Sequence, residues 1–262
     1  MSLFSEFSTI SKEEWLSKIE KDLKGKALED LNWKISEDWM VSPIAHSSDL
    51  AVRETTILHQ EKTDNNWEIG EVIFVKDAKT ANQEAIDGTL HYRNREQTIE
   101  ELTQILLSTN AYLKEIEANQ VNSLQLSIAI GESYFINIAK IRALKILWHN
   151  LMSAYELETP LTLEAHLATS SLTDDQHQNM IQMSTQALSA VIAGVDRLFL
   201  TPADHSYTAF TKRIARNVQH LLQLESHLDQ VIDPSAGSYY IEKLTNEIVE
   251  QVWGKFTALA SH

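Results

Sequence analysis

The chain has 262 residues, 43% of them hydrophobic, and a formal net charge of −15 because 37 acidic residues outnumber 22 basic ones. This size allows one sizeable core with a small appendage, and the negative charge disfavours nucleic acids and anionic membranes as partners. The sequence has no cysteine, so disulfides are excluded. It begins without the apolar segment of a signal peptide, and we therefore expect a cytoplasmic protein.

The first part of the chain is predicted to form an arm. Ser11 and Glu14 make a capping box that begins a helix extending to about Leu23. The next segment, LNWKISEDWMVSPI, is predicted to be extended. Such an arm could lie on its own domain or wrap a partner subunit, and composition alone favours neither. We therefore expect an arm at 1–45 and a main domain at 46–262.

From residue 50 onward, segments that alternate apolar and polar residues are separated by segments of helical period. The predicted strands are, in order, AVRETTILH, WEIGEVIFV, IDGTLHY, LQLSIAI, LTLEAHLA and DRLFLT. The predicted helices are 77–86, 96–117, 134–151, 176–193, 206–226 and a last one that ends near Ala258. Strands alternating with helices indicate crossover units and a parallel sheet. Polar residues within the strands favour a barrel with a polar lumen over a sheet covered on both faces.

Sequence motifs for cofactor chemistry are mostly absent. There is no GxGxxG motif, no Walker A loop and no pair of His at metal-binding spacing. The stretch DQHQNM, 175–180, approaches the DxHxxG motif by which many enzymes ligate cobalamin, but Met180 replaces the glycine and the pattern is helical. His166 in mid-strand is the best candidate for a substrate contact, and His91 is a second. We predict no catalytic residue and no metal or cofactor ligand.

Three stretches of the sequence resemble the methylmalonyl-CoA mutase family. DPSAGSYYIE at 233–242, preceded by RIARNVQHLLQLES, is similar to the family's D-P-A-A-G-S-Y-Y-V-E corner and the helix before it. IAIGESYFINIAKIRALKILW at 128–148 resembles a barrel strand and its helix. EEWLSKIEKDLKGKALEDLNWK resembles the arm with which these mutases embrace a partner subunit. The resemblance covers 1–90 loosely and 120–262 well, and it does not specify the acyl-CoA substrate.

The resemblance implies a fold derived from a TIM barrel, an incomplete (β/α) barrel with about six of the eight strands. It also gives the DPSAGS corner a structural role. Asp233 would cap backbone donors, Pro234 would fix φ, and Gly237 would permit a tight turn with positive φ. Tyr239 is expected to be a packing residue in the same corner.

The departures from the family pattern concern its chemistry. The sequence has no counterpart of the family's C-terminal cobalamin domain, nor of the strand–helix units that carry an Arg for the substrate carboxylate. Thr89 and Leu90 stand where the family has Tyr and His, and His91 is one residue out of register. Ala168 replaces a Gln that follows the position of His166. The resemblance therefore implies that the site has lost its reactive residues.

These departures imply a shortened, non-catalytic small subunit of a cobalamin-dependent methylmalonyl-CoA mutase, an isomerase of the carbon skeleton. Adenosylcobalamin is then expected on a large catalytic subunit and not on this chain. The arm is expected to contact that subunit in a heterodimer. Two alternatives stay open. The chain could be an isomerase in its own right, or a stand-alone protein that binds an acyl-CoA or another small ligand in a reduced barrel.

Overall fold

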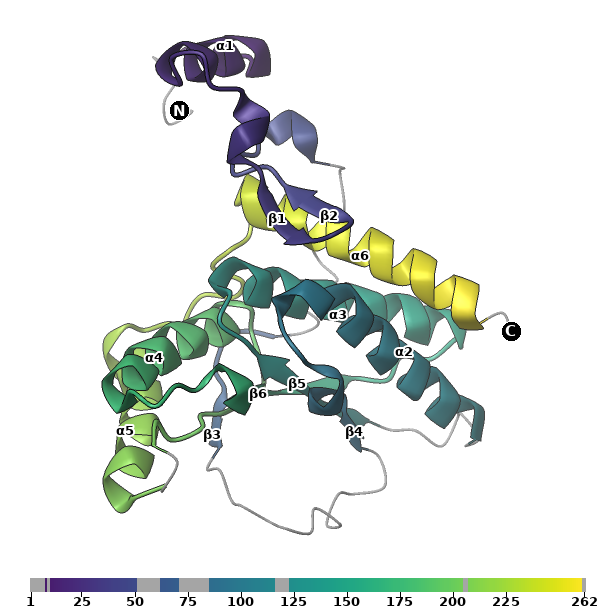
Figure 1. Cartoon of the computed structure of the whole chain (residues 1–262). Helices are drawn as coiled ribbons and strands as arrows, with labels where there is room; N and C mark the ends of the chain where they lie inside the picture. The colour runs from purple at the N-terminus through teal and green to yellow at the C-terminus, as the bar shows by residue number, and fades with distance from the viewer. Residues whose placement is uncertain are drawn as a thin grey trace.

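A parallel sheet of five strands lies at the centre of the main domain (Figure 1). The computed structural model describes residues 8, 10–50, 62–70, 85–115, 123–204 and 207–260. The strands of this sheet are β3 (Glu68–Gly70), β4 (Ala85–Asp87), β5 (Leu124–Ile130), β6 (Leu161–Leu167) and β7 (Arg197–Phe199). Their spatial order is β3-β7-β6-β5-β4, and every neighbouring pair is parallel.

The strand order places the first strand of the sheet beside the last one. β3 pairs with β7, where Glu68 lies opposite Arg197, whereas β4 to β7 are neighbours in chain order. The expected α/β class with a parallel sheet is confirmed, and the arrangement is consistent with a partial α/β barrel. The predicted strand AVRETTILH, at 51–59, lies outside the described residues, as does most of the predicted helix 77–86.

Helices cover one face of the sheet in two layers. The helices of the main domain are α2 (Thr98–Glu115), α3 (Tyr134–Ala154), α4 (Gln176–Ile192), α5 (Ala209–His220) and α6 (Tyr239–Ala260), while α1 (Lys12–Asp22) lies outside these layers. α2 and α3 lie over the sheet, α6 crosses them on the outer side, and α4 packs against β6 and β7 (Figure 1). The helix ends lie within about one turn of the predicted ones, with α5 passing into a π-helical segment, Leu221–Glu225. None of the described helices is long and apolar enough to cross a membrane.

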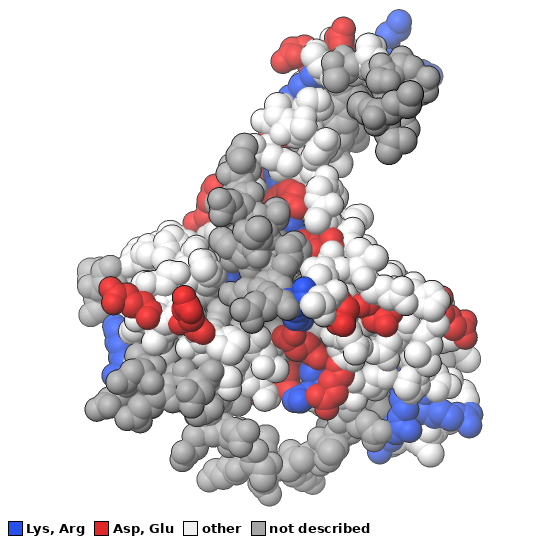
Figure 2. Space-filling model, turned by 180° about the vertical axis from the view of Figure 1, so that it is seen from behind, with Lys and Arg blue, Asp and Glu red and all other residues white. Residues whose placement is uncertain are grey.

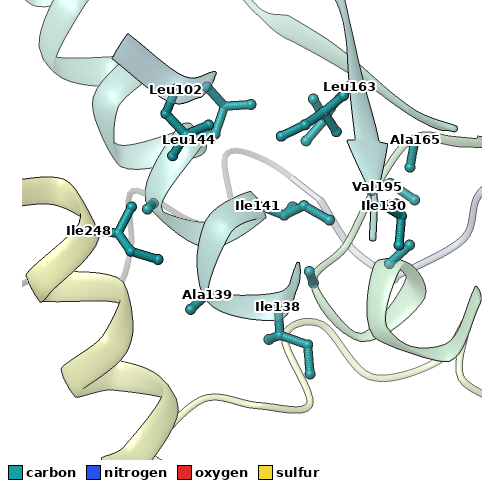
Figure 3. Packing of buried hydrophobic residues seen from close by; sticks show 14 of the residues in the cluster. Leu102, Ile130, Ile138, Ala139, Ile141, Leu144, Leu163, Ala165, Val195 and Ile248 are labelled. Carbon is teal, nitrogen blue, oxygen red and sulfur yellow. The ribbon is translucent and has the colours of Figure 1, made fainter. Parts of the chain in front are cut away.

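The alternation of residues in the strands separates a core face from a polar face. In β5 the Leu and Ile residues are buried, while Gln125 and Ser127 on the other face are partly exposed. Figure 3 shows Ile141 of α3 directed toward the sheet, and Ile248 of α6 approaching α3 from its opposite side. α3 is therefore buried between sheet and helix, which explains why its apolar residues are distributed around the helix and most of them are buried.

A β-hairpin extends the layers on the outer side of α6. The segment predicted as extended forms two antiparallel strands, β1 (Trp33–Ser36) and β2 (Trp39–Val41). Trp39 is only 4% exposed, and its Nε1 donates a hydrogen bond to Glu247 Oε2 of α6 at 2.9 Å. Ile35 and Val41 belong to the same hydrophobic cluster as the main core. The hairpin thus packs on its own chain.

Helix α1, in contrast, projects away from the main domain (Figure 1). The predicted capping box is present, since Ser11 Oγ accepts from Glu14 N at 3.2 Å and Ser11 N donates to Glu14 Oε2 at 3.0 Å. No residue of α1 is buried. An ion pair between Lys12 and Asp49, and a contact between the rings of Trp15 and His46, connect it to the chain that follows the hairpin.

The predicted strand IDGTLHY is shorter than expected. β4 ends at Asp87, and Gly88–His91 form a 3₁₀ helix instead. The change occurs because the Asp87 carboxylate accepts a hydrogen bond from Thr89 N at 3.0 Å, which caps the 3₁₀ turn and competes with strand pairing. The prediction of a continuous strand through this segment is therefore wrong.

Candidate functional site

A cavity of about 410 Å³ lies at the carboxyl ends of β4, β5 and β6. Ligands of open parallel α/β sheets bind at this edge, because the loops that follow the strands converge there. The lining residues come from the three strands and from the turns after β4 and β6: Asp87, Thr89, Tyr92, Ser127, Ala129, His166, Leu167, Ala168, Thr169 and Ser170. Segments far apart in the sequence thus meet at one site.

His166 lines this cavity, as its place on the polar strand face predicted. Its ring stacks on Phe199 of β7 with a centroid distance of 4.4 Å and an interplanar angle of 4°. Nε2 is buried without a hydrogen-bond partner among the described residues and lies 3.7 Å from Glu164 Oε2, too far for a good hydrogen bond. Ring stacking therefore holds this imidazole, with the Glu164 carboxylate beside it.

The segment after β4 places only part of the predicted site at the cavity. Thr89 lines it, whereas Leu90 is 65% exposed and His91 is not among the lining residues. The prediction that His91 lies on a strand is wrong. The segment is a 3₁₀ helix, in which side chains do not alternate between two faces. Among the predicted contacts, His166 alone is therefore brought to the cavity.

Tyr92 forms a wall of the cavity that sequence reasoning missed. Its side chain is buried, and its hydroxyl donates to Glu132 Oε2 at 3.2 Å. Burial, together with the Glu132 carboxylate, raises the pKa of Tyr92 far above its ordinary value, so the phenol keeps its proton. A Cβ on Gly131 would lie 1.9 Å from the Tyr92 hydroxyl oxygen, so only glycine leaves room for this ring.

A buried ion pair supports Tyr92 from behind. Lys140 of α3 and Glu101 of α2 are each 1% exposed, and Lys140 Nζ lies 3.0 and 3.1 Å from the two carboxylate oxygens. The same ammonium group donates to Ala129 O at 2.7 Å and lies 4.9 Å from the centroid of the Tyr92 ring. Burial raises the pKa of Glu101, while Lys140 opposes this shift. The positive charge of Lys140 is thus neutralised within the protein.

A second charged group spans the polar face of the sheet. Arg197 of β7 forms ion pairs with Glu164 of β6 and with Glu68 of β3, where its Nη2 lies 2.6 Å from Glu68 Oε2. Burial alone would raise the pKa of Glu164, but His166 and Arg197 outweigh it and hold this pKa below its ordinary value. The guanidinium is thus engaged by two carboxylates and ties three neighbouring strands together.

The DPSAGS corner is built around an arginine of α3. Arg142 is 1% exposed and forms ion pairs with Asp233 and with Glu242, the latter at 2.6 Å. Asp233 Oδ1 also accepts from Ser235 Oγ at 2.7 Å. Gly237 has a φ of +78°, as predicted for the tight turn. Asp233 therefore binds a buried cation, a role beyond the backbone capping expected for it.

The other corner residues are more exposed. Pro234 is exposed, and Tyr239, at the start of α6, is 46% exposed. The neighbouring Tyr240 packs edge-on against Phe135, with ring centroids 5.4 Å apart. The packing role expected for Tyr239 is thus performed by Tyr240. The corner lies at the start of α6 and contributes no residue to the cavity.

The stretch that approaches a cobalamin motif is a helix start. Asp175 is the N-cap of α4, and its Oδ1 accepts from His177 N at 2.8 Å and from Gln178 N at 3.2 Å. His177 is exposed in the first turn of that helix. Within the described residues, no group of three His, Cys, Asp or Glu side chains is placed to hold a metal ion.

Comparison with known proteins identifies the family to which the chain belongs. The methylmalonyl-CoA mutase family model matches residues 78–262. A methylmalonyl-CoA mutase small subunit of Porphyromonas gingivalis is 28% identical over 395 positions, which cover 98% of this chain and 64% of that protein. A methylmalonyl-CoA mutase of Escherichia coli is 42% identical over 130 residues, 47% of this chain and 18% of that enzyme.

The large subunit of the Porphyromonas gingivalis mutase is also similar, with 38% identity over 133 residues, 48% of this chain and 19% of that subunit. The chain spans less than two thirds of the length of each of these relatives. The family model, however, matches well over half of the chain. On this match and on the parallel sheet with its cavity, the chain belongs to the methylmalonyl-CoA mutase family.

Proposed function

We propose that this chain is a non-catalytic small subunit that supports a cobalamin-dependent methylmalonyl-CoA mutase. The proposal rests mainly on which residues line the cavity. Thr89, Leu90 and Ala168 stand at the positions where the family resemblance expects Tyr, His and Gln. Thr89 and Ala168 line the cavity while Leu90 is exposed, so a hydroxyl and a methyl group replace the phenol and the amide.

A shortened barrel is part of this proposal. The pairing of β3 with β7 is the neighbour relation that closes a barrel between its first and last strands. The alignment with the Porphyromonas gingivalis small subunit has 395 positions, although this chain has 262 residues, so at least 133 positions hold no residue of this chain. Loss of whole strand–helix units would account for both features.

The proposed partner is a mutase large subunit, contacted through α1. This helix carries Trp15, Leu16 and Ile19, and Leu23 follows as its C-cap; its own chain buries none of the four fully. Relatives of this chain in Porphyromonas gingivalis are named small and large subunits. An amphipathic helix that projects from the domain would bury this apolar stripe on a partner. The hairpin β1–β2, already packed on α6, would fix the direction in which α1 leaves the domain.

The cofactor would then belong to the partner. The only stretch of this sequence that approaches a cobalamin-ligating motif caps a helix through Asp175 and presents His177 to solvent. These residues do not fit a role as a corrinoid ligand, because the aspartate that would orient the histidine already caps backbone groups. No catalytic step is therefore assigned to this chain.

A second candidate function is a stand-alone binding protein for an acyl-CoA or another small ligand. The cavity of about 410 Å³ favours it, because this volume lies in the range of about 300–1,000 Å³ found for small-molecule sites. The buried Lys140–Glu101 ion pair lies behind Tyr92 and stabilises this wall of the cavity, as expected of a preformed ligand site.

Titration with adenosylcobalamin tests the division of roles. We expect the isolated chain to cause no saturating change in the visible absorbance of the cofactor, and to show no isomerisation of methylmalonyl-CoA. A mixture with the large subunit from the same genome should bind the cofactor and be active. Stoichiometric binding by the isolated chain at micromolar concentration would contradict the proposal.

A further inference from the structure

We infer that the outward face of α5 is a docking surface for an acidic segment of another protein that carries apolar side chains at helical spacing. This face contributes no residue to the cavity, and α5 lies in a part of the molecule remote from α1 (Figure 1). A partner bound to α5 would therefore not compete with one bound to α1.

The opposite face of α5 is fixed against the main domain. Thr211, Ala215 and Gln219, which follow one another at intervals of four residues, are buried. Gln219 Oε1 also accepts a hydrogen bond from Trp67 Nε1 at 3.3 Å. Because residues four apart share one face of a helix, this buried row leaves the other face of α5 to solvent.

Large apolar side chains are exposed on the outward face. Phe210 is 51% exposed, Leu221 48% and Leu224 65%. Together with the exposed Arg213 and Asn217 they follow the spacing i, i+3, i+7, i+11 and i+14, which places all five on one stripe. Exposed apolar side chains that gather on one stripe, unlike single scattered ones, indicate an interaction surface.

The stripe ends in the π-helical segment that follows α5. Ser226 N donates to Leu221 O at 2.9 Å, a hydrogen bond that spans five residues instead of four. Turns of this kind are rare and occur frequently at functional sites. Leu221 and Leu224 both lie in this segment, so the unusual backbone and the exposed apolar side chains coincide.

Basic side chains accompany the apolar stripe. Lys212, Arg213 and Arg216 are exposed, and His220 is half-buried beside them. Among the described residues, Lys212 and Arg213 form no ion pair, while the Arg213 guanidinium lies 5.7 Å from the centroid of the Phe210 ring. These cations are therefore available to an acidic partner.

The positive charge of α5 stands out on an acidic chain. No Asp or Glu occurs between residues 205 and 224, although the whole chain carries 37 of them. Seen from behind, a group of Lys and Arg side chains gathers at the lower right, in the part of the molecule to which α5 belongs (Figure 2). α5 thus presents a local basic surface that complements an acidic segment.

An acidic protein segment fits this surface better than a nucleic acid or a membrane. Charges at physiological ionic strength interact over about 8 Å, so a short segment on α5 is attracted by Lys212 and Arg213 and screened from the rest of the chain. A nucleic acid or an anionic membrane extends beyond that range and is repelled by the net charge of −15. Apolar side chains of the segment would cover Phe210, Leu221 and Leu224, and Arg and aromatic residues are enriched at protein interfaces.

Fluorescence anisotropy of a labelled peptide tests this inference on the full chain. The probe is a designed peptide of about 16 residues in which Leu and Phe recur at helical spacing among Glu residues. We expect saturable binding that weakens about tenfold between about 50 and about 300 mM NaCl. A peptide with Gln in place of every Glu, and one with Ser in place of every Leu and Phe, should each bind about tenfold more weakly.

Two variants of the surface separate the contribution of charge from that of apolar contact. Arg213→Glu should raise the Kd of the acidic peptide about tenfold, and Leu224→Ser about fivefold. Lys34→Glu is the matched control, because it makes the same change of charge at an exposed lysine of β1, and it should leave the Kd unchanged. All three side chains are exposed, so thermal unfolding should show that each variant is folded.

Labelled oligo(dT) and vesicles of phosphatidylcholine and phosphatidylserine are the competing probes. We expect neither to bind as tightly as the acidic peptide. The inference is overturned if the acidic peptide does not bind, or if Lys34→Glu weakens its binding as much as Arg213→Glu does. It is equally overturned if neither variant of α5 weakens the binding, or if the oligonucleotide or the vesicles bind more tightly than the peptide.

Discussion

Gly237 occupies a backbone conformation that other residues adopt at a cost. Its φ is +78°, and a Cβ built there meets no atom within 4 Å, so the cost of a side chain is backbone strain and not a clash. Gly237→Ala should therefore lower the free energy of unfolding by about 1–2 kcal/mol. The measurement is urea denaturation.

Gly254, which is exposed within α6 and also has no atom near its Cβ position, provides the control. Gly254→Ala should raise the stability by up to about 1 kcal/mol, because alanine favours a helix. Equal effects of the two substitutions would show that the corner does not depend on positive φ.

The Glu164 carboxylate makes the free energy of unfolding depend on pH in the acid range. Its pKa in the folded protein lies below the ordinary value of 4.5, because Arg197 and His166 outweigh the opposing effect of burial. A carboxylate with a lowered folded pKa contributes stability above the unfolded pKa and loses it as the pH falls through the folded value. The stability difference between wild type and Glu164→Gln should therefore be largest near pH 6 and shrink below about pH 4.5.

Chemical denaturation at several pH values measures this difference. Glu225→Gln serves as a comparison, since Glu225 is an exposed residue of the π-helical segment with no ion pair among the described residues. A difference for Glu164→Gln that is constant with pH would mean that the pair with Arg197 contributes nothing in solution.

At the scale of elements, Arg142 joins α3 to the corner and to α6. Its guanidinium pairs with Asp233 in the corner and with Glu242 in the first turn of α6. Arg142→Met should destabilise the protein by about 3–5 kcal/mol, because two partly buried carboxylates lose their cation. Adding Asp233→Asn to this variant should recover part of the loss. Differential scanning calorimetry measures both, with the exposed Lys212→Met as a control of small effect.

If Arg142→Met unfolds no more easily than Lys212→Met, the corner is held by apolar packing alone. If the double variant is less stable than Arg142→Met, the Asp233 carboxylate stabilises the corner through contacts other than the one with Arg142, such as that with Ser235.

Elements with strong local signals could be predicted from the sequence. The capping box of α1, the helix at 176–193 and the alternation in β5 each depend on residues close together in the chain, and each prediction is confirmed. IDGTLHY was predicted as a strand, and only its first two residues belong to one. The side chain of Asp87 instead caps a 3₁₀ turn after three strand residues.

The cavity itself could be predicted only in part. His166 was identified by its place on a polar strand face, and it lies where β6 ends. Tyr92 and the Lys140–Glu101 pair were missed, because their roles depend on contacts between α2, α3 and the turn after β4. Gly131 was an available signal, since a glycine directly after a strand often permits a close approach.

At the scale of the whole molecule, the chain separates a packed body from a projecting helix. The sheet, its covering helices and the hairpin share one hydrophobic cluster. α1 contributes no buried residue to it and is held by the Lys12–Asp49 pair and one ring contact. An amphipathic helix that the body does not bury is what the proposed association with a large subunit requires.

Sedimentation velocity of the chain mixed with the mutase large subunit from the same genome tests the central claim most directly. The account predicts a single boundary with the mass of a one-to-one heterodimer. A chain that lacks residues 1–26 should keep its thermal stability, since α1 buries no residue, but should sediment separately from the large subunit. Independent sedimentation of the two full-length proteins, or a complex that forms equally well without α1, would contradict the account.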